Sequence, residues 1–188
     1  MVEGNQPMQA WPTHGLQAME RIIIEARDAN KMLFIWDKQG SVATYLNYKG
    51  FLASLGPEII KKALGRQENA DVGEFIRVQM INGMRSGDKL CWDLDSTTPK
   101  WSDYAVEGTF NPEHFFNWEY MKVEANYMPY VREDENHGIG GVNPGFGYIR
   151  SPDFSMTFRC GAETEEEVAA VIALLPNFNT DFHHVIIE

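Results

Sequence analysis

The chain has 188 residues, of which 44% are hydrophobic and 23% charged, a balance typical of a single folded domain. Lys and Arg total 16 against 27 Asp and Glu, so the formal net charge is −11. This charge argues against proteins that neutralise nucleic-acid phosphates or dock on anionic lipid. Two cysteines are too few for a disulfide scaffold, and no segment approaches the roughly 20 apolar residues that span a bilayer. The composition therefore predicts a cytoplasmic protein that binds neither nucleic acid nor membrane.

The first 12 residues are polar and contain Pro7, Trp11 and Pro12, which is typical of an extended arm. Thr13 is a candidate cap for a helix over residues 15–30, whose apolar positions recur at helical spacing. We expect an arm over residues 1–12 and a single α/β domain over residues 13–188.

The next segments alternate between short apolar runs and amphipathic stretches. Residues 32–36, MLFIW, predict a buried strand, and Ser41 is a candidate cap for the helix after it. Pro57 and Gly65 suit the start and the end of a further helix. A longer helix is expected over residues 71–85, and a second strand over residues 90–94, LCWDL.

In the second half, Asn111 and Pro112 favour the start of a helix. Its predicted apolar face consists of Phe116, Tyr120, Val123 and Tyr127. A long loop is expected over residues 132–151, followed by strands over 154–159 and 181–187. A capping box at residues 164–167 predicts the helix between those two strands.

Strands that alternate with helices predict an α/β fold with a mostly parallel sheet of about four or five strands. Helices would flank the sheet in a three-layer arrangement that is Rossmann-like or resembles a degenerate P-loop fold. Ligands of such sheets bind beyond the carboxyl ends of the strands. The residues expected at those ends are Asp37, Asp93, Asp95, Arg159, Cys160 and Glu188.

Residues 90–97, LCWDLDST, resemble the first motif of the haloacid-dehalogenase-like phosphatases, an apolar strand followed by D-x-D-x-T. The resemblance implies that Asp93 is the nucleophile, that Asp95 is the acid/base, and that Mg²⁺ is the cofactor. Asp37 and Ser41 would line the same crevice if Asp37 and Asp93 lay on adjacent parallel strands. The alternative is that Asp93 and Asp95 end a strand and cap the segment after it.

Other motifs are incomplete. A phosphate-binding loop needs G-x-x-x-x-G-K-[ST], whereas residues 37–42 read DKQGSV, so no NTP hydrolysis is expected. The glycine-rich segment 138–147 has Asn143 where G-x-G-x-x-G needs glycine, and a surface loop is expected there. The sequence contains no H-x-x-x-H or C-x-x-C pair, so we expect no metal site. Cys91 and Cys160 are expected to be core thiols.

The segment over residues 115–121 is too aromatic to fit one helix face. Phe115, Trp118 and Met121 are candidate interface residues, with Trp11 of the arm as a second anchor. The alternative is that this segment is buried on two sides within its own domain.

Together, these features predict a non-catalytic α/β structural or adaptor subunit of a larger intracellular assembly. It would need no cofactor and would bind other protein subunits, including ones with basic surfaces. A cytoskeletal or ciliary assembly is one setting that such a subunit would fit. The alternative function is a Mg²⁺-dependent phosphate-handling enzyme that uses Asp93 and Asp95.

Overall fold

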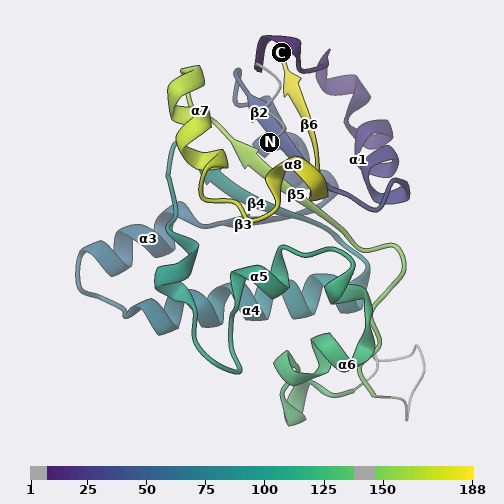
Figure 1. Ribbon diagram of the computed structural model, residues 1–188, viewed down its shortest axis with the longest axis vertical. Helices are drawn as coiled ribbons and strands as arrows, with labels where there is room; N and C mark the ends of the chain where they lie inside the picture. Colours follow the sequence, from purple (N-terminus) through teal and green to yellow (C-terminus); the bar gives the residue numbers. More distant parts are fainter. Residues whose placement is uncertain (1–7, 138–146) are drawn as a thin grey trace, which may run out of the picture.

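The computed structural model of the chain describes residues 8–137 and 147–188. Within them, parallel strands form one sheet in the order β1-β6-β2-β5-β4-β3 (Figure 1). The strands are β1 (Thr13–His14), β2 (Met32–Asp37), β3 (Phe51–Ser54), β4 (Lys89–Asp95), β5 (Ser155–Cys160) and β6 (Phe182–Ile187). The predicted α/β fold with a parallel sheet is confirmed. The two edge strands, β1 and β3, were not anticipated.

Helices connect the strands, and the longest is the predicted one near residue 80. The α-helices are α1 (Met19–Asp28), α2 (Ser41–Lys49), α3 (Gly56–Ala63), α4 (Asn69–Ser86), α5 (Pro112–Phe115), α6 (Glu124–Tyr127), α7 (Glu165–Ile172) and α8 (Phe178–Asp181). Short 3-10 helices are η1 (Met8–Ala10), η2 (Leu16–Ala18), η3 (Trp101–Tyr104), η4 (Tyr120–Lys122), η5 (Met128–Tyr130) and η6 (Glu133–Glu135). The predicted capping box of α7 is present, because Thr164 and Glu167 exchange hydrogen bonds.

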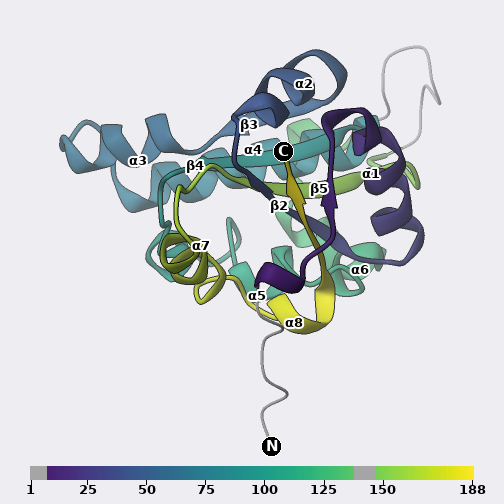
Figure 2. The ribbon, with the colours of Figure 1, turned by 90° about the horizontal axis from the view of Figure 1, so that it is seen from above.

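The sheet separates two hydrophobic layers because successive side chains of a strand point to opposite faces. On β2, Leu33 and Ile35 pack with α1 and α2, whereas Phe34 and Trp36 join the cluster that contains α4 and α7. Viewed from above, α1 and α2 lie away from α5, α7 and α8 (Figure 2). The molecule is therefore a three-layer α/β structure, with the sheet between two layers of helices.

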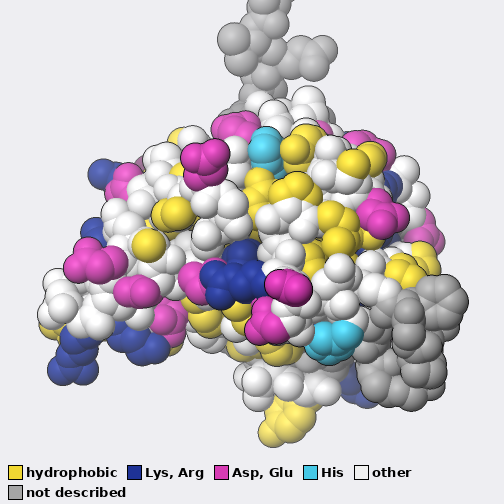
Figure 3. Space-filling model, turned by 90° about the horizontal axis from the view of Figure 1, so that it is seen from below, with side chains coloured by type: hydrophobic (Ala, Val, Ile, Leu, Met, Phe, Trp, Pro, Cys, Tyr) yellow, Lys and Arg dark blue, Asp and Glu magenta, His cyan; other side chains and the backbone are white. Residues whose placement is uncertain are grey.

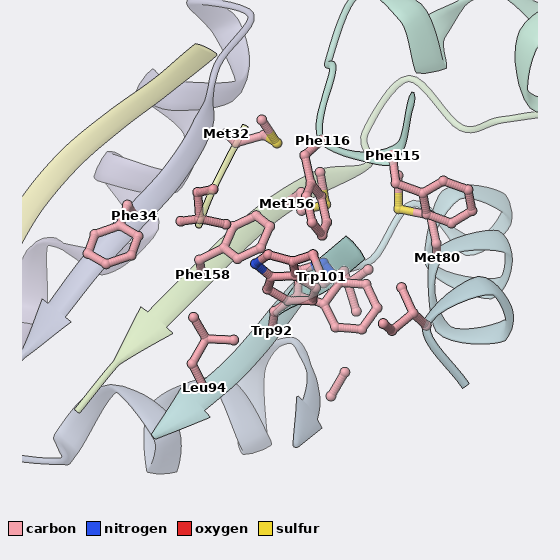
Figure 4. Close-up of a cluster of buried hydrophobic side chains, with 14 of the residues drawn as sticks. Met32, Phe34, Met80, Trp92, Leu94, Trp101, Phe115, Phe116, Met156 and Phe158 are labelled. Atoms are coloured by element: carbon pink, nitrogen blue, oxygen red, sulfur yellow. The ribbon is translucent and has the colours of Figure 1, made fainter. Parts of the chain in front are cut away.

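The larger layer holds most of the aromatic side chains. Trp92 and Phe158 project from neighbouring strands toward Trp101 and Phe116 (Figure 4). Trp101 meets Phe116 edge to face at 4.7 Å between ring centroids, and Phe116 meets Phe158 at 5.1 Å. Such pairs contribute roughly 0.5–1.5 kcal/mol beyond the area that they bury. The connection after β4 is thus part of the core.

That connection is not the helix predicted from Asn111 onward. It is divided into α5, η4 and α6, because the side-chain oxygen of Asn117 accepts a hydrogen bond from the backbone N–H of Tyr120 at 2.9 Å. Phe115, Trp118 and Met121 are 0%, 3% and 1% exposed. The expectation that these three residues lie toward another surface is therefore wrong, and the alternative of burial within the domain is right.

The described part of the predicted arm packs onto the domain. Trp11 is 5% exposed, and its ring lies 6.0 Å from that of Phe34 and 4.5 Å from that of His184. The carbonyl of Pro12 accepts the N–H of Ile186, and Thr13 belongs to β1 instead of capping a helix. The expectation that Trp11 anchors a partner is wrong, because its own domain buries it. Residues 1–7 and 138–146 lie outside the described residues, and the expected glycine-rich loop falls largely in the second range.

A buried arginine fixes the segment after α6 onto α4. Arg77 is 1% exposed, donates to the carbonyl of Tyr130 at 2.7 Å, and pairs with Glu74 and Glu135. The hydrogen bond from Arg77 holds the pKa of Glu135 below its ordinary value. On the face shown in Figure 3, basic side chains near the centre have acidic ones beside them.

Candidate functional site

The strand order places the carboxyl ends of β2 and β5 side by side. The chain leaves β2 into α2, which packs on one face of the sheet through Val42 and Leu46. It leaves β5 toward α7, which packs on the opposite face through Val168 and Val171. Two neighbouring strands whose connections diverge in this way define the position where open α/β sheets bind ligands.

Arg159, the penultimate residue of β5, fills this position. Its Nε lies 2.9 Å from Asp37 Oδ2, and its Nη1 lies 2.9 Å from Asp93 Oδ1 and 3.2 Å from Asp95 Oδ1. The residue is 6% exposed. One guanidinium therefore joins carboxylates from β2 and from β4, on either side of its own strand. We call these four residues the Arg159 network.

The charge of Arg159 is fixed by this environment. Burial alone would lower the pKa of the guanidinium, but the hydrogen bonds that it donates to Asp93 and Asp37 outweigh burial and raise the pKa. A guanidinium is also the cation best matched to several carboxylates, because its donors form a planar fork. Arg159 is therefore a permanent positive charge among the carboxylates at these strand ends.

Asp37 links the network to the first turn of α2. Its Oδ2 also accepts the backbone N–H of Val42 at 3.1 Å, a place that a bound anion takes at other helix N-termini. Only Lys38, Gln39 and Gly40 connect β2 to α2, too few for a loop that wraps a phosphate chain. Gly40 has a φ of 71° and precedes the helix, and the Ser41 hydroxyl has no hydrogen-bond partner in the described structure, so the expected Ser41 cap is wrong.

The end of β4 is irregular in a way that aims both carboxylates at Arg159. The pairing with β5 shifts register between Asp93 and Asp95, and Asp95 has a φ of 49°. The backbone N–H of Asp95 donates to Asp93 Oδ1 at 3.2 Å, and its carbonyl accepts Gly161 N–H at 2.7 Å. A Cβ at position 161 would lie 2.8 Å from Arg159 Nη2, so glycine gives the guanidinium room. The Asp93 side chain is 14% exposed and that of Asp95 is 69% exposed.

The structure thus brings Asp37, Asp93 and Asp95 together, with one correction. The enzyme hypothesis required Asp37 and Asp93 to lie on adjacent parallel strands, and this requirement is not met, because β5 lies between β2 and β4. That intervening strand supplies Arg159, which the sequence marked only as a residue at a strand end. An arginine inside the apolar run SMTFRC was the available signal, since a buried charge requires partners.

The remaining candidates lie elsewhere or are inert. Glu188, beyond β6, pairs with Lys38 at 3.1 Å on the surface. Cys91 and Cys160 are both buried, and burial raises the pKa of each thiol. Across residues 8–137 and 147–188, no group of three or more His, Cys, Asp or Glu side chains is arranged to hold a metal ion.

In the described ranges, no helix is both long and apolar enough to cross a membrane. Comparison of the chain with protein-family models, with curated proteins and with solved structures found no match.

Proposed function

We propose that this chain is a non-catalytic α/β subunit that acts through contacts with other proteins in a larger assembly. The observation that carries the proposal is Arg159 at the ligand position of the sheet, with its charge neutralised by three carboxylates of the same chain. Side chains of this chain occupy the positions where a phosphate and a metal ion would bind. The carboxylate of Asp37 stands at the helix N-terminus, and the guanidinium of Arg159 stands where a cation would bridge Asp93 and Asp95.

The Asp37 carboxylate disfavours binding of phosphate, and the Arg159 guanidinium disfavours binding of Mg²⁺. A phosphate entering the first turn of α2 would meet the Asp37 carboxylate that already accepts Val42 N–H. A Mg²⁺ ion binding Asp93 and Asp95 would displace or lie beside a guanidinium that remains protonated. Each carboxylate of the network already accepts a hydrogen bond from Arg159, which supports a structural role for this edge of the sheet.

The second candidate is the Mg²⁺-dependent phosphate-handling enzyme. The observation in its favour is that Asp93 and Asp95, the pair in the phosphatase-like motif, meet Asp37 at one edge of the sheet. In this reading, Asp93 is the nucleophile and Asp95 the acid/base, and Mg²⁺ would displace Arg159 or bind beside it.

Mg²⁺ titration monitored by thermal unfolding separates the two candidates, because a ligand that binds only the folded state raises Tm. For the non-catalytic subunit, millimolar Mg²⁺, alone or with ATP or p-nitrophenyl phosphate, leaves the Tm of the natural chain unchanged. Mg²⁺ raises the Tm of Arg159→Met, since three carboxylates then lack their cation. The matched control is the Arg159→Met/Asp93→Asn double variant, in which the rise is reduced.

Two outcomes contradict the proposal. A dose-dependent rise in the natural chain that is lost in Asp93→Asn, together with release of p-nitrophenol, would establish the enzyme instead. Absence of any Mg²⁺ response in a folded Arg159→Met chain would show that the guanidinium does not occupy a cation position.

A further inference from the structure

A groove lies beside η3 and α5 and continues to the chain after α7. It consists of two adjoining cavities of about 500 Å³ and 340 Å³. Ser102, Pro112 and Glu113 line both cavities, so they form the boundary between them. This groove is on the face of the sheet opposite α1 and α2, and it shares no residue with the Arg159 network.

The larger cavity has an apolar lining that the fold holds in place. Val106, Phe110 and Tyr130 are among its lining residues. The Tyr130 hydroxyl and His114 Nδ1 are 2.5 Å apart, and the Tyr130 carbonyl accepts a hydrogen bond from buried Arg77 at 2.7 Å. A site whose side chains are already fixed loses little conformational entropy when a ligand binds.

The lining of the larger cavity is negatively charged. Glu107 and Glu113 line it, and both are exposed. No lysine or arginine is among its lining residues, and the ion pairs of the described residues include neither glutamate. By contrast, Glu74 and Glu135 nearby are both paired with Arg77. The cavity is therefore complementary to a single positive charge.

The smaller cavity differs in charge and offers apolar contacts. It is lined by Trp101, Leu174 and Pro176, with Lys100 among the lining residues. Leu174 is 36% exposed, and Val106 of the larger cavity is 37% exposed, so each cavity presents an aliphatic side chain to solvent. The lining of the smaller cavity includes Lys100 beside Glu113, so it has no net formal charge, and an aliphatic side chain would gain by burial against Trp101 and Leu174.

We propose that this groove is a docking site for a partner-protein segment that places a lysine or arginine in the larger cavity and a hydrophobic residue in the smaller one. The basic head pairs with Glu107 and Glu113, and its aliphatic stem packs against Val106 and Tyr130. The hydrophobic residue contacts Leu174. This inference rests on the proposed function and specifies the chemistry of the partner.

Two peptides of equal length test the proposal, one of alternating leucine and arginine and one of alternating leucine and glutamate. Binding is measured by calorimetry, and the site is mapped by ¹H–¹⁵N NMR on the full chain. The Leu/Arg peptide is expected to bind and to shift amides of η3, α5 and the segment after α7, whereas the Leu/Glu peptide is expected not to bind. Glu107→Gln/Glu113→Gln should weaken binding about tenfold or more. Val106→Ser should also weaken it.

The matched control is Glu25→Gln/Asp28→Asn on α1, which removes the same charge from the opposite side of the sheet. The affinity of this control variant for the Leu/Arg peptide should stay within about twofold of that of the natural chain. Equal weakening in both double variants would show attraction by net charge alone and overturn the site. No binding of the Leu/Arg peptide, or shifts confined to other elements, would also overturn it.

The result is distinguishable from the Mg²⁺ test. Peptide binding in the groove of a chain that shows Asp93-dependent phosphatase activity would uphold the groove and overturn the non-catalytic function. If the chain shows no Mg²⁺ response and the Leu/Arg peptide does not bind, the docking site is overturned and the non-catalytic function is not.

Discussion

At the scale of single residues, Arg159 shows how a buried charge is tolerated only with its partners. Arg159→Met leaves the Asp37 and Asp93 carboxylates without their shared cation, and we expect a loss of about 3–5 kcal/mol in the free energy of unfolding. Arg159→Lys should recover only part of it, because an ammonium lacks the planar fork that reaches both carboxylates. Guanidinium chloride unfolding measures these changes.

The control for that measurement is Arg21→Met. Arg21 pairs with Glu25 on the surface of α1, where the side chains are 58% and 52% exposed, so the expected change is within about 0.5 kcal/mol. A similar loss for Arg21→Met and Arg159→Met would contradict the idea that burial makes the Arg159 network decisive.

Glu135 gives a prediction about pH. The hydrogen bond from Arg77 lowers the pKa of Glu135 in the folded chain below the ordinary pKa of 4.5. Ionised Glu135 therefore stabilises the fold fully above pH 4.5, and this stabilisation is lost as the pH falls through the lowered pKa. Glu135→Gln should therefore be less stable than the natural chain at pH 7, and the difference should shrink below about pH 4.5. Urea unfolding at a series of pH values measures it. A difference that stays constant with pH would refute the assignment, and exposed Glu165→Gln is the control.

At the scale of elements, α4 and η3 approach so closely that one glycine is required. A Cβ at position 73 would overlap the backbone oxygen of Tyr104 and touch Phe110 at 3.6 Å. Gly73→Ala should cost about 1–3 kcal/mol despite the higher helix propensity of alanine. Asn82→Ala, on the exposed face of the same helix, should change stability by about 0.5 kcal/mol or less. Thermal unfolding compares the two, and an unchanged Gly73→Ala would show that η3 can move.

The elements that the sequence revealed are those with a strong local signal. Helical spacing identified α4, the capping box identified α7, and an apolar run identified β2. The edge strands β1 and β3 have two and four residues, too short for a hydrophobic period. The connection after β4 buries many aromatic side chains, so a helical spacing could be traced through residues that are buried for other reasons.

For the candidate site, the sequence located the carboxylates but not their arrangement. Asp37, Asp93 and Asp95 follow apolar runs, and parallel strands bring their ends to one edge. Strand order depends on crossovers that a single sequence does not encode locally, so β5 between β2 and β4 was not foreseen. Without that order, Arg159 had no identifiable partners.

At the scale of the whole molecule, Trp11 joins the start of the described chain to its last strand. Its ring lies 4.5 Å from that of His184 on β6 and 6.1 Å from that of Phe178 on α8. Trp11→Ala should cost about 3–5 kcal/mol, because a large buried ring leaves a cavity. Trp11→Phe should lose less. Denaturant unfolding of the full chain measures both changes. A Trp11→Ala chain as stable as the natural one would indicate that the arm does not contribute to the stability of the domain.

The position of β6 between β1 and β2 has a consequence for synthesis. The first two strands to leave the ribosome cannot pair with each other, because the last described strand must enter between them. Until β6 emerges, the apolar residues of β2 have an unpaired backbone on that side, which is an edge open to pairing with other chains. The sheet therefore cannot be completed until β6 has been synthesised, and chains that stop before residue 182 would expose the edge of β2 to pairing with other chains.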